Sequence, residues 1–137
     1  MPVSRLDHFA VLTEDAISTA EFYGFTLGLE QGPRPNFSVA GVWLYCDGQP
    51  LVHIVEKANV PRADGLLDHV AFSASGLADF VGRLKSRSIA YDLRHFPEGS
   101  AFGGAWQLFF LDPNGARIEI DFPASEPQPA LEELAAS

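Results

Sequence analysis

Four side chains are the candidate metal ligands of this chain: His8, His53, His69 and Glu119. Imidazole nitrogen and carboxylate oxygen together suit divalent Fe, Mn, Ni, Co or Zn, whereas a metal that prefers thiolate would need cysteines. Two histidines and one carboxylate leave coordination positions open for substrate oxygens or O₂. These residue types therefore predict a divalent-metal site that polarises an oxygen-rich small molecule.

The four residues occupy matching positions in an internal repeat of the sequence. Leu6-Asp7-His8-Phe9-Ala10 recurs as Leu67-Asp68-His69-Val70-Ala71, and Ala20-Glu21-Phe22-Tyr23-Gly24 recurs as Ala78-Asp79-Phe80-Val81-Gly82. Each copy then ends in two strand-like runs joined by a turn, at 42–46 with 51–55 and at 106–110 with 116–120. We predict repeats over about 5–57 and 66–122, forming one domain (4–123) that is followed by an acidic tail (124–137).

Each repeat reads as strand, helix and three further strands. Alternating patterns over Leu6–Leu12 and Leu67–Ala74 predict the first strands. Apolar residues at helical spacing from Ile17 to Leu27 predict a helix that Thr13 or Asp15 caps and Gly28 ends. The other expected elements are a helix at 77–87, a strand at 89–96, a short edge strand near 32–36, and hairpin turns at 47–50 and 112–115. The fold class is thus α+β, with two βαβββ modules whose curved mixed sheets enclose a metal-binding cleft.

The repeat places the candidate ligands at equivalent positions. His8 and His69 fall on the first strand of each module, and His53 and Glu119 fall on the last. Because strand side chains alternate between faces, Glu119 should share a polar face with Arg117 and Asp121, while Asp7 and His8 should lie on opposite faces. Pseudo-twofold symmetry would then bring all four to one point. For His53, two roles stay open: a fourth ligand or a catalytic general base.

Other side chains near this cleft have simpler interpretations. Four aromatic residues of the hairpin strands are expected mainly in the core: Trp43, Tyr45, Trp106 and Phe109. His95 has no counterpart in the other repeat, so we interpret it as a loop or rim residue outside the metal site.

Composition excludes several classes of partner. The 137 residues carry a net charge of −9, which would repel nucleic acid and anionic membranes. No stretch approaches the roughly 20 apolar residues of a membrane-spanning helix, and the N-terminus has no apolar signal region. Cys46, the single cysteine, cannot form an internal disulfide. These features predict a cytoplasmic protein whose partner is a small molecule.

The repeated motifs resemble the vicinal oxygen chelate superfamily, which includes glyoxalase I, extradiol dioxygenases, fosfomycin resistance proteins, methylmalonyl-CoA epimerase and bleomycin resistance proteins. The resemblance spans about 5–122 and rests on Leu6-Asp7-His8, Glu21-Phe22-Tyr23, Leu67-Asp68-His69-Val70-Ala71, Asp112-Pro113-Asn114-Gly115 and Ile118-Glu119-Ile120. It implies that His8, His69 and Glu119 are the metal ligands. His53 occupies the extra ligand position where glyoxalase I has Glu. A homodimer is also implied, with the cleft formed within one chain or across two.

The resemblance leaves three functions to compare. The favoured one is a metal-dependent lyase or isomerase of the glyoxalase type. An Fe(II) extradiol-type dioxygenase needs the same two histidines and glutamate. A non-catalytic, drug-binding protein of the bleomycin-resistance type would suit the acidic charge, but such binders lack the ligand set that this chain carries.

Overall fold

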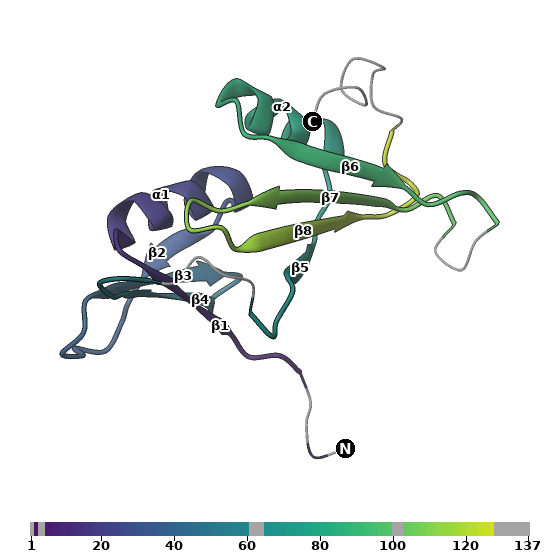
Figure 1. Ribbon diagram of the computed structural model, residues 1–137. Helices are drawn as coiled ribbons and strands as arrows, with labels where there is room; N and C mark the ends of the chain where they lie inside the picture. The colour runs from purple at the N-terminus through teal and green to yellow at the C-terminus, as the bar shows by residue number, and fades with distance from the viewer. Residues whose placement is uncertain (1, 3–4, 61–64, 100–102, 128–137) are drawn as a thin grey trace. The chain divides into compact units, whose positions relative to one another are not determined.

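Each half of the chain folds into one strand, one helix and three more strands (Figure 1). The computed structural model describes residues 2, 5–60, 65–99 and 103–127, and the chain divides into unit 1 (1–62) and unit 2 (63–137). Unit 1 contains β1 (Phe9–Thr13), α1 (Ala16–Leu27), β2 (Glu30–Gly32), β3 (Gly41–Cys46) and β4 (Gln49–Glu56). Unit 2 contains β5 (Val70–Ser73), α2 (Leu77–Ser86), β6 (Tyr91–His95), β7 (Trp106–Leu111) and β8 (Arg117–Phe122). The predicted α+β fold of two βαβββ modules is confirmed.

Both units build a mixed sheet of four strands with the same topology. The strand orders are β1-β4-β3-β2 and β5-β8-β7-β6. In each unit the first strand pairs in parallel with the last, so Ala10 lies opposite His53 and Ala71 lies opposite Glu119. The remaining pairs are antiparallel. Because of this topology, the residues just before β1 lie beside β4, which carries His53. In the same way, the residues just before β5 lie beside β8, which carries Glu119.

Two tight turns set the register of the last two strands in each unit. Asp47 and Gly48 have φ values of 49° and 77°, as the mirror-image turn of a two-residue hairpin requires. In unit 2 the Asp112 carboxylate accepts hydrogen bonds from the backbone N–H groups of Asn114 and Ala116, each at 2.8 Å. Both turns lie where the sequence predicts them.

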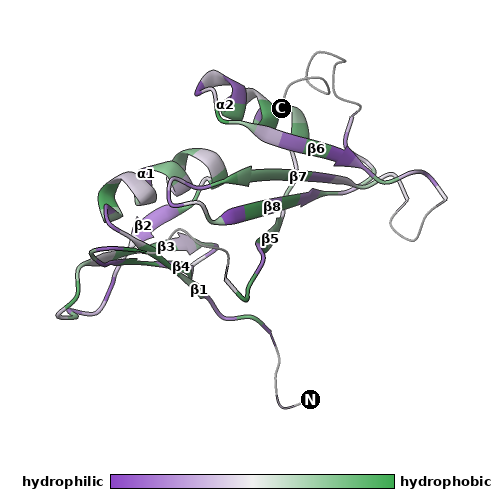
Figure 2. Cartoon of the chain, viewed as in Figure 1, coloured by the Kyte–Doolittle hydropathy of each residue, from purple (hydrophilic) through white to green (hydrophobic). Residues whose placement is uncertain are grey.

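Helix α1 has the predicted ends, but its buried face is different from the predicted one. The Asp15 carboxylate accepts from the Ser18 N–H at 3.1 Å, and Gly28 ends the helix with φ 72°. Ile17, expected on the buried face, is 81% exposed. The buried side chains are Ala16, Thr19, Tyr23 and Thr26. Apolar residues lie on both the exposed and the buried side of this helix, as with Ile17 and Tyr23, and Figure 2 shows hydrophobic and paler residues along its visible side. Their spacing alone therefore does not identify the face that packs on the sheet.

The first strand of each unit begins later than predicted, so His8 and His69 each lie one residue before it rather than on it. In unit 1, the partner strand β4 has Pro50 near this point, and proline has no N–H for the ladder. In unit 2, the partner strand β8 begins only at Arg117, directly after its hairpin turn. Each parallel ladder therefore stops before it reaches the histidine.

The sheet of unit 2 separates an apolar face from a polar one. Leu108, Ile118 and Ile120 are fully buried, and Phe122 meets Phe80 of α2 edge to face at 5.5 Å. Trp106 and Phe109 are buried as predicted, whereas Trp43 and Tyr45 in unit 1 are only half-buried. The reason is alternation, because Trp43 is the cross-strand neighbour of His53 on the face away from the buried Val42 and Leu44.

A glutamate at the end of the last strand in unit 1, and one shortly after the last strand in unit 2, each hold the start of that unit's helix. The Glu56 carboxylate accepts from the Ala16 N–H at 3.1 Å. The Glu126 carboxylate accepts from the N–H groups of Gly76 and Leu77 at 2.6 and 3.3 Å. Glu126 thus ties the beginning of the predicted tail to α2, while residues 128–137 of that tail lie outside the described residues. No described helix is long and apolar enough to cross a membrane.

Removing the Glu126 carboxylate should loosen the N-terminus of α2. A helix-capping acceptor contributes about 1 kcal/mol, and Gly76 has no side chain to replace it. We expect Glu126→Ala to lower the free energy of unfolding by about that amount and to speed hydrogen exchange at Leu77 and its neighbours. Glu126→Gln should lose less. Glu98→Ala is the control, and equal exchange rates in all three variants would contradict the capping role.

Candidate metal centre

One imidazole and one carboxylate face each other in unit 2. His69 Nε2 lies 3.3 Å from Glu119 Oε1. Glu119 projects from β8 and is only 7% exposed, while His69 stands directly before β5, the parallel neighbour of β8. Two ligands bound to one ion at right angles, with bonds of about 2.1 Å, are about 3.0 Å apart. The spacing of this pair therefore fits a shared divalent ion.

Both candidate histidines before the first strands are oriented in the same way. Asp7 Oδ2 lies 2.7 Å from His8 Nδ1, and Asp68 Oδ2 lies 2.8 Å from His69 Nδ1. In each case the hydrogen bond with the histidine is the main cause that lowers the pKa of the aspartate. Since Nδ1 is held by a carboxylate, Nε2 is the nitrogen left for a metal, an arrangement common among metal-bound histidines.

The predicted alternation of faces is wrong at Asp7 and His8, whose side chains contact each other. Asp7 was expected on the opposite face from His8, as in a regular strand. Both residues instead precede β1, where the backbone is not held in a ladder, so the Asp7 carboxylate reaches the neighbouring ring. The role of Asp7 and Asp68 was missed in the sequence, although the repeated Leu-Asp-His motif was the signal that could have shown it.

In unit 1 three rings form a stack. The His53 ring lies between His8, with centroids 3.8 Å apart, and Trp43, 3.9 Å away, and both interplanar angles are 12°. The Nε2–H of His53 donates to the backbone carbonyl of Pro50 at 3.0 Å, so Nδ1 keeps the free electron pair. Burial, and then the charge of His8, lower the pKa of His53, which favours the neutral ring.

The stack limits what His8 and His53 can do together. A metal lies close to the plane of each imidazole that binds it, at about 2.1 Å from the nitrogen. Two parallel rings 3.8 Å apart have lone pairs that run side by side and do not converge. In this arrangement only one of the two rings can bind a given ion, and the ring of His8, with Nδ1 on Asp7, is the one oriented like His69.

Glu119 shares the polar face of β8 with Asp121, as the alternation predicts. Gln107 Nε2 donates to Glu119 Oε2 at 3.4 Å. Burial, and then the hydrogen bond and charge of Glu119, raise the pKa of Asp121 to about 6. Among the described residues, the buried Oδ1 of Asp121 has no hydrogen-bond partner. This excess of carboxylate oxygen also suits a cation. Gln107 was missed in the sequence, since only the register of β7 against β8 reveals it.

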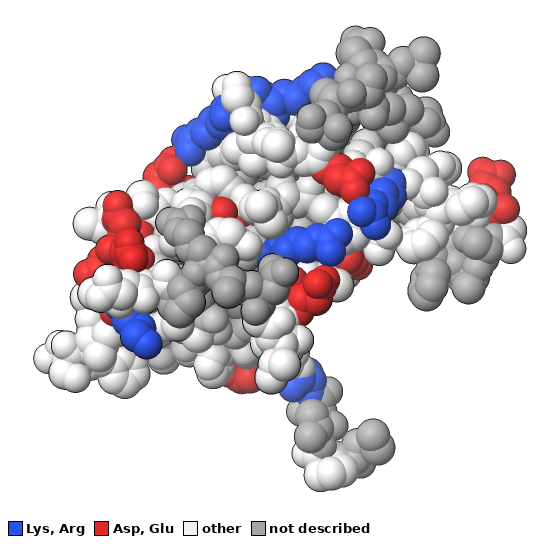
Figure 3. Space-filling model, viewed as in Figure 1, with Lys and Arg blue, Asp and Glu red and all other residues white. Residues whose placement is uncertain are grey.

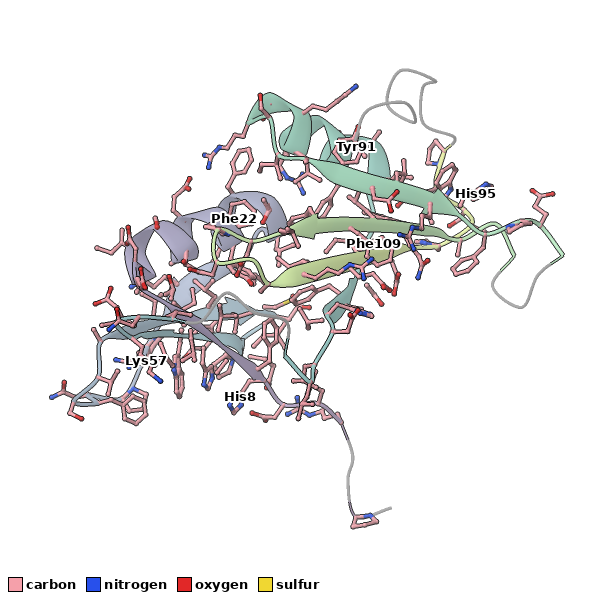
Figure 4. The ribbon with its side chains drawn as sticks, viewed as in Figure 1. His8, Phe22, Lys57, Tyr91, His95 and Phe109 are labelled. Carbon is pink, nitrogen blue, oxygen red and sulfur yellow. The ribbon has the colours of Figure 1, made fainter. Side chains whose placement is uncertain are left out.

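The structure brings the four predicted residues together as two pairs, His8 with His53 and His69 with Glu119. Over its described residues, neither unit gathers three or more His, Cys, Asp or Glu side chains into a metal site. The meeting of the two pairs at one ion stays a prediction. His95 lies at the end of β6, stacked on Trp106 at 4.0 Å, with its Nε2–H donating to the Gly104 carbonyl at 3.1 Å. Figure 4 labels His8, which directly precedes β1, and His95, the last residue of β6.

Replacing Asp121 by asparagine should stabilise the metal-free chain most at neutral pH. The folded-state pKa of about 6 lies above the ordinary 3.8, so the protonated carboxyl favours folding below pH 4. That contribution is lost as the pH rises through 6, where Asp121 ionises in a partly buried position beside the Glu119 carboxylate. We expect Asp121→Asn to gain on the order of 1 kcal/mol at pH 7.5 and less at pH 4.5, because solvent screens part of the repulsion.

Thermal unfolding at the two pH values measures this difference. Asp47→Asn is the control, since Asp47 is exposed and asparagine is also favoured in its turn. A gain from Asp121→Asn that is equal at both pH values would show that ionisation of Asp121 is not its cause.

Comparisons with known proteins agree with the fold and the motifs. No family model matches the chain. The chain is 27% identical over 125 residues to glyoxylase I 4 of Arabidopsis thaliana, covering 86% of this chain and 70% of that protein.

Solved structures with the same fold are numerous. A protein of Bacillus anthracis assigned to the glyoxalase family superposes with a TM-score of 0.71 at 26% identity, over 88% of this chain and 96% of that one. Lactoylglutathione lyase of Agrobacterium tumefaciens (TM-score 0.65, 20% identity, 90% and 97% coverage) shares the fold. So does the fosfomycin resistance protein FosX of Listeria monocytogenes (TM-score 0.68, 17% identity, 96% and 98% coverage). With its duplicated βαβββ modules, the chain has the fold of the glyoxalase/bleomycin resistance/dioxygenase proteins, the vicinal oxygen chelate superfamily, and it is similar in sequence to glyoxalase-family proteins.

Proposed function

We propose that this protein is a divalent-metal-dependent enzyme acting on a small molecule that chelates the ion through adjacent oxygens. A glyoxalase-type lyase or isomerase is the favoured activity. One observation carries the proposal: His69 Nε2 faces Glu119 Oε1 at 3.3 Å while Asp68 holds the other ring nitrogen. A histidine fixed in this way has one nitrogen to offer, and a buried carboxylate next to it needs a cation.

His69 and Glu119 would hold the ion, with His8 as the third ligand that the repeated Leu-Asp-His motif predicts. This donor set suits divalent Fe, Mn, Ni, Co or Zn. When bound, the metal supplies Lewis-acid polarisation of a substrate oxygen. The chain's own contribution is orientation: Asp7 and Asp68 fix the two imidazoles, and Gln107 holds Glu119 by its second oxygen. Three protein ligands leave positions open for two substrate oxygens.

We assign proton transfer to His53. Its Nε2–H is engaged by Pro50, and its Nδ1 electron pair can accept a proton from substrate. The lowered pKa keeps this ring neutral near pH 7, and Trp43 and His8 hold it from both sides. Of the two roles open in the sequence, the base is the one that the stacked geometry favours, because the parallel rings cannot both bind one ion.

The glyoxalase type, the dioxygenase and the drug binder differ in the chemistry that each requires of the site. The glyoxalase type is favoured because a relative at 27% identity carries the name glyoxylase I 4. An extradiol-type dioxygenase would use the same three ligands with Fe(II) and O₂. A drug binder without catalysis would not need His69 and Glu119 to face each other. We also propose a homodimer, which light scattering of the purified protein tests.

Metal binding should depend on His69 and Glu119. We expect His69→Ala and Glu119→Gln each to weaken binding of Zn or Ni at least tenfold, because each removes one of three ligands. Equilibrium dialysis with elemental analysis measures it. His95→Ala is the matched control, because this histidine is engaged by Trp106 and Gly104. If wild type holds no more metal than His69→Ala, the proposal of a metal-dependent enzyme is rejected.

His53→Gln should separate the base from a ligand. We expect kcat to fall about 100-fold, as for loss of a general base, while bound metal stays within twofold of wild type. Activity of the wild type should also fall with pH as the pH drops below the lowered pKa of His53. A matching loss of metal and activity in His53→Gln would assign His53 as a ligand and reject the base.

Two assays divide the enzyme classes. With methylglyoxal and glutathione as substrates, we expect metal-dependent formation of the thioester product. With Fe(II) and catechols, we expect no O₂ uptake above that of His69→Ala. The reverse result would select the dioxygenase, and inactivity in both assays by a metal-loaded protein would reject the glyoxalase type.

A further inference from the structure

Two arginines converge on one aromatic ring in unit 2. The guanidinium carbons of Arg94 and Arg117 lie 4.7 and 4.5 Å from the centre of the Phe109 ring, and the ring is only 7% exposed. Figure 4 shows Phe109 on β7 among nitrogen-bearing side chains. In a chain whose net charge is −9, two cations held on one ring are unusual. Phe109 acts as a platform that fixes both of them by cation–π contact.

The platform lies next to the candidate ligands. Phe109 is the cross-strand neighbour of Glu119 on one side and of Asp92 on the other. The His69 ring is 6.4 Å from the Phe109 ring and meets it edge to face. A molecule bound at Glu119 and His69 would therefore extend along this row of side chains towards the arginines.

Aspartates orient the arginines without using all of their donors. Arg94 gives Nε and Nη2 to Asp92 Oδ2 at 2.8 and 2.7 Å, and Arg117 gives Nη1 to Asp68 Oδ2 at 3.3 Å. A guanidinium has five N–H donors, so further ones remain for an incoming anion. The side chains of Arg94 and Arg117 are 55% and 36% exposed. Figure 3 shows basic and acidic side chains side by side over the sheet of this unit.

A cavity opens beside the platform. It has a volume of about 240 Å³, and Phe109, Arg117, Asp92, Tyr91 and Leu111 are among the residues that line it. The pocket is shallow and open to solvent, with room for a carboxylate and a few attached carbon atoms, and Arg94 lies outside its lining. Arg117 offers the charge, and Tyr91, Phe109 and Leu111 offer the apolar wall. The Asp92 carboxylate in the lining is already paired with Arg94.

We propose that this part of unit 2 binds a carboxylate group carried by the substrate, with Arg94 and Arg117 as the anion-binding residues and Phe109 as their platform. The inference deepens the proposed function and rests on it for the statement that the anion belongs to the substrate. It narrows the substrate to a small molecule with a chelating oxygen pair at one end and a carboxylate at the other. The anion site itself does not require the metal.

Anion binding by the metal-free, full-length protein tests the site. The protein is stripped of metal, freed of chelator by desalting, and titrated with malonate or with neutral malonamide at constant ionic strength. Nuclear magnetic resonance follows the Nε–H signals of the arginines. We expect saturable shifts at Arg94 and Arg117 with malonate and none with malonamide, and weaker binding of malonate at higher salt.

Matched variants show which groups bind the anion. We expect Arg94→Gln and Arg117→Gln each to weaken malonate binding about tenfold, because each removes charge-assisted hydrogen bonds. Arg83→Gln is the control, since Arg83 also lies over a phenylalanine of unit 2, at 4.3 Å from Phe80. Phe109→Leu keeps both charges and should also weaken binding, and the backbone spectrum shows whether each variant is folded.

Three results would overturn the inference: equal shifts with malonate and malonamide, equal weakening in Arg83→Gln and Arg94→Gln, or wild-type affinity in both arginine variants. The two proposals fail in different ways. Loss of metal binding with intact malonate binding rejects the metal enzyme and keeps an anion site. Metal binding without malonate binding rejects the carboxylate-bearing substrate and keeps the enzyme.

Discussion

The parallel pairing of the first and last strand in each unit is the constraint on which the candidate site depends. A parallel pair needs a crossover, and here α1 and β2–β3, or α2 and β6–β7, supply it. The pairing places the residue that enters the first strand beside the strand that carries the second candidate ligand. His69 and Glu119, fifty residues apart in the chain, thereby come within 3.3 Å of each other. Sheet topology, more than local sequence, creates this pair.

The same pairing forces polar groups into a half-buried face, and their partners explain much of the local chemistry. Glu119 is 7% exposed. Its Oε2 accepts a hydrogen bond from Gln107, and its Oε1 lies 3.3 Å from His69 Nε2. Asp121, next on that face, stays protonated more readily because the charge of Glu119 and burial both disfavour its ionised form. A folded protein keeps such a carboxylate cluster at a cost in stability, which is typical of a site kept for a cation or a proton.

The two units use the shared plan differently. Unit 1 fills its polar face with flat rings, in the order His8, His53 and Trp43, and the neighbouring Phe37 lies 6.2 Å from Trp43. Unit 2 fills the matching face with charges around Phe109. The first arrangement favours a neutral imidazole at His53, whereas the second places the carboxylates Glu119 and Asp121 near the guanidinium groups of Arg94 and Arg117. The duplicated fold thus presents two different sets of side chains, because the strand positions are shared while the residues on them differ.

The sequence by itself determined the repeat, the order of elements, both hairpin turns and the four candidate residues, because alternation, turn residues and the Leu-Asp-His motif are local signals. Tertiary structure decided the rest. Alternation could not show that the ladders end before His8 and His69, since that depends on Pro50 and on the start of β8 in the partner strands. Nor could it show the ring stack, the contact of Gln107 with Glu119, or the two arginines on Phe109, because these join residues that only strand register brings together. The buried face of α1 was also beyond local reasoning, since a helix that is apolar on every side has no single face that its own sequence selects.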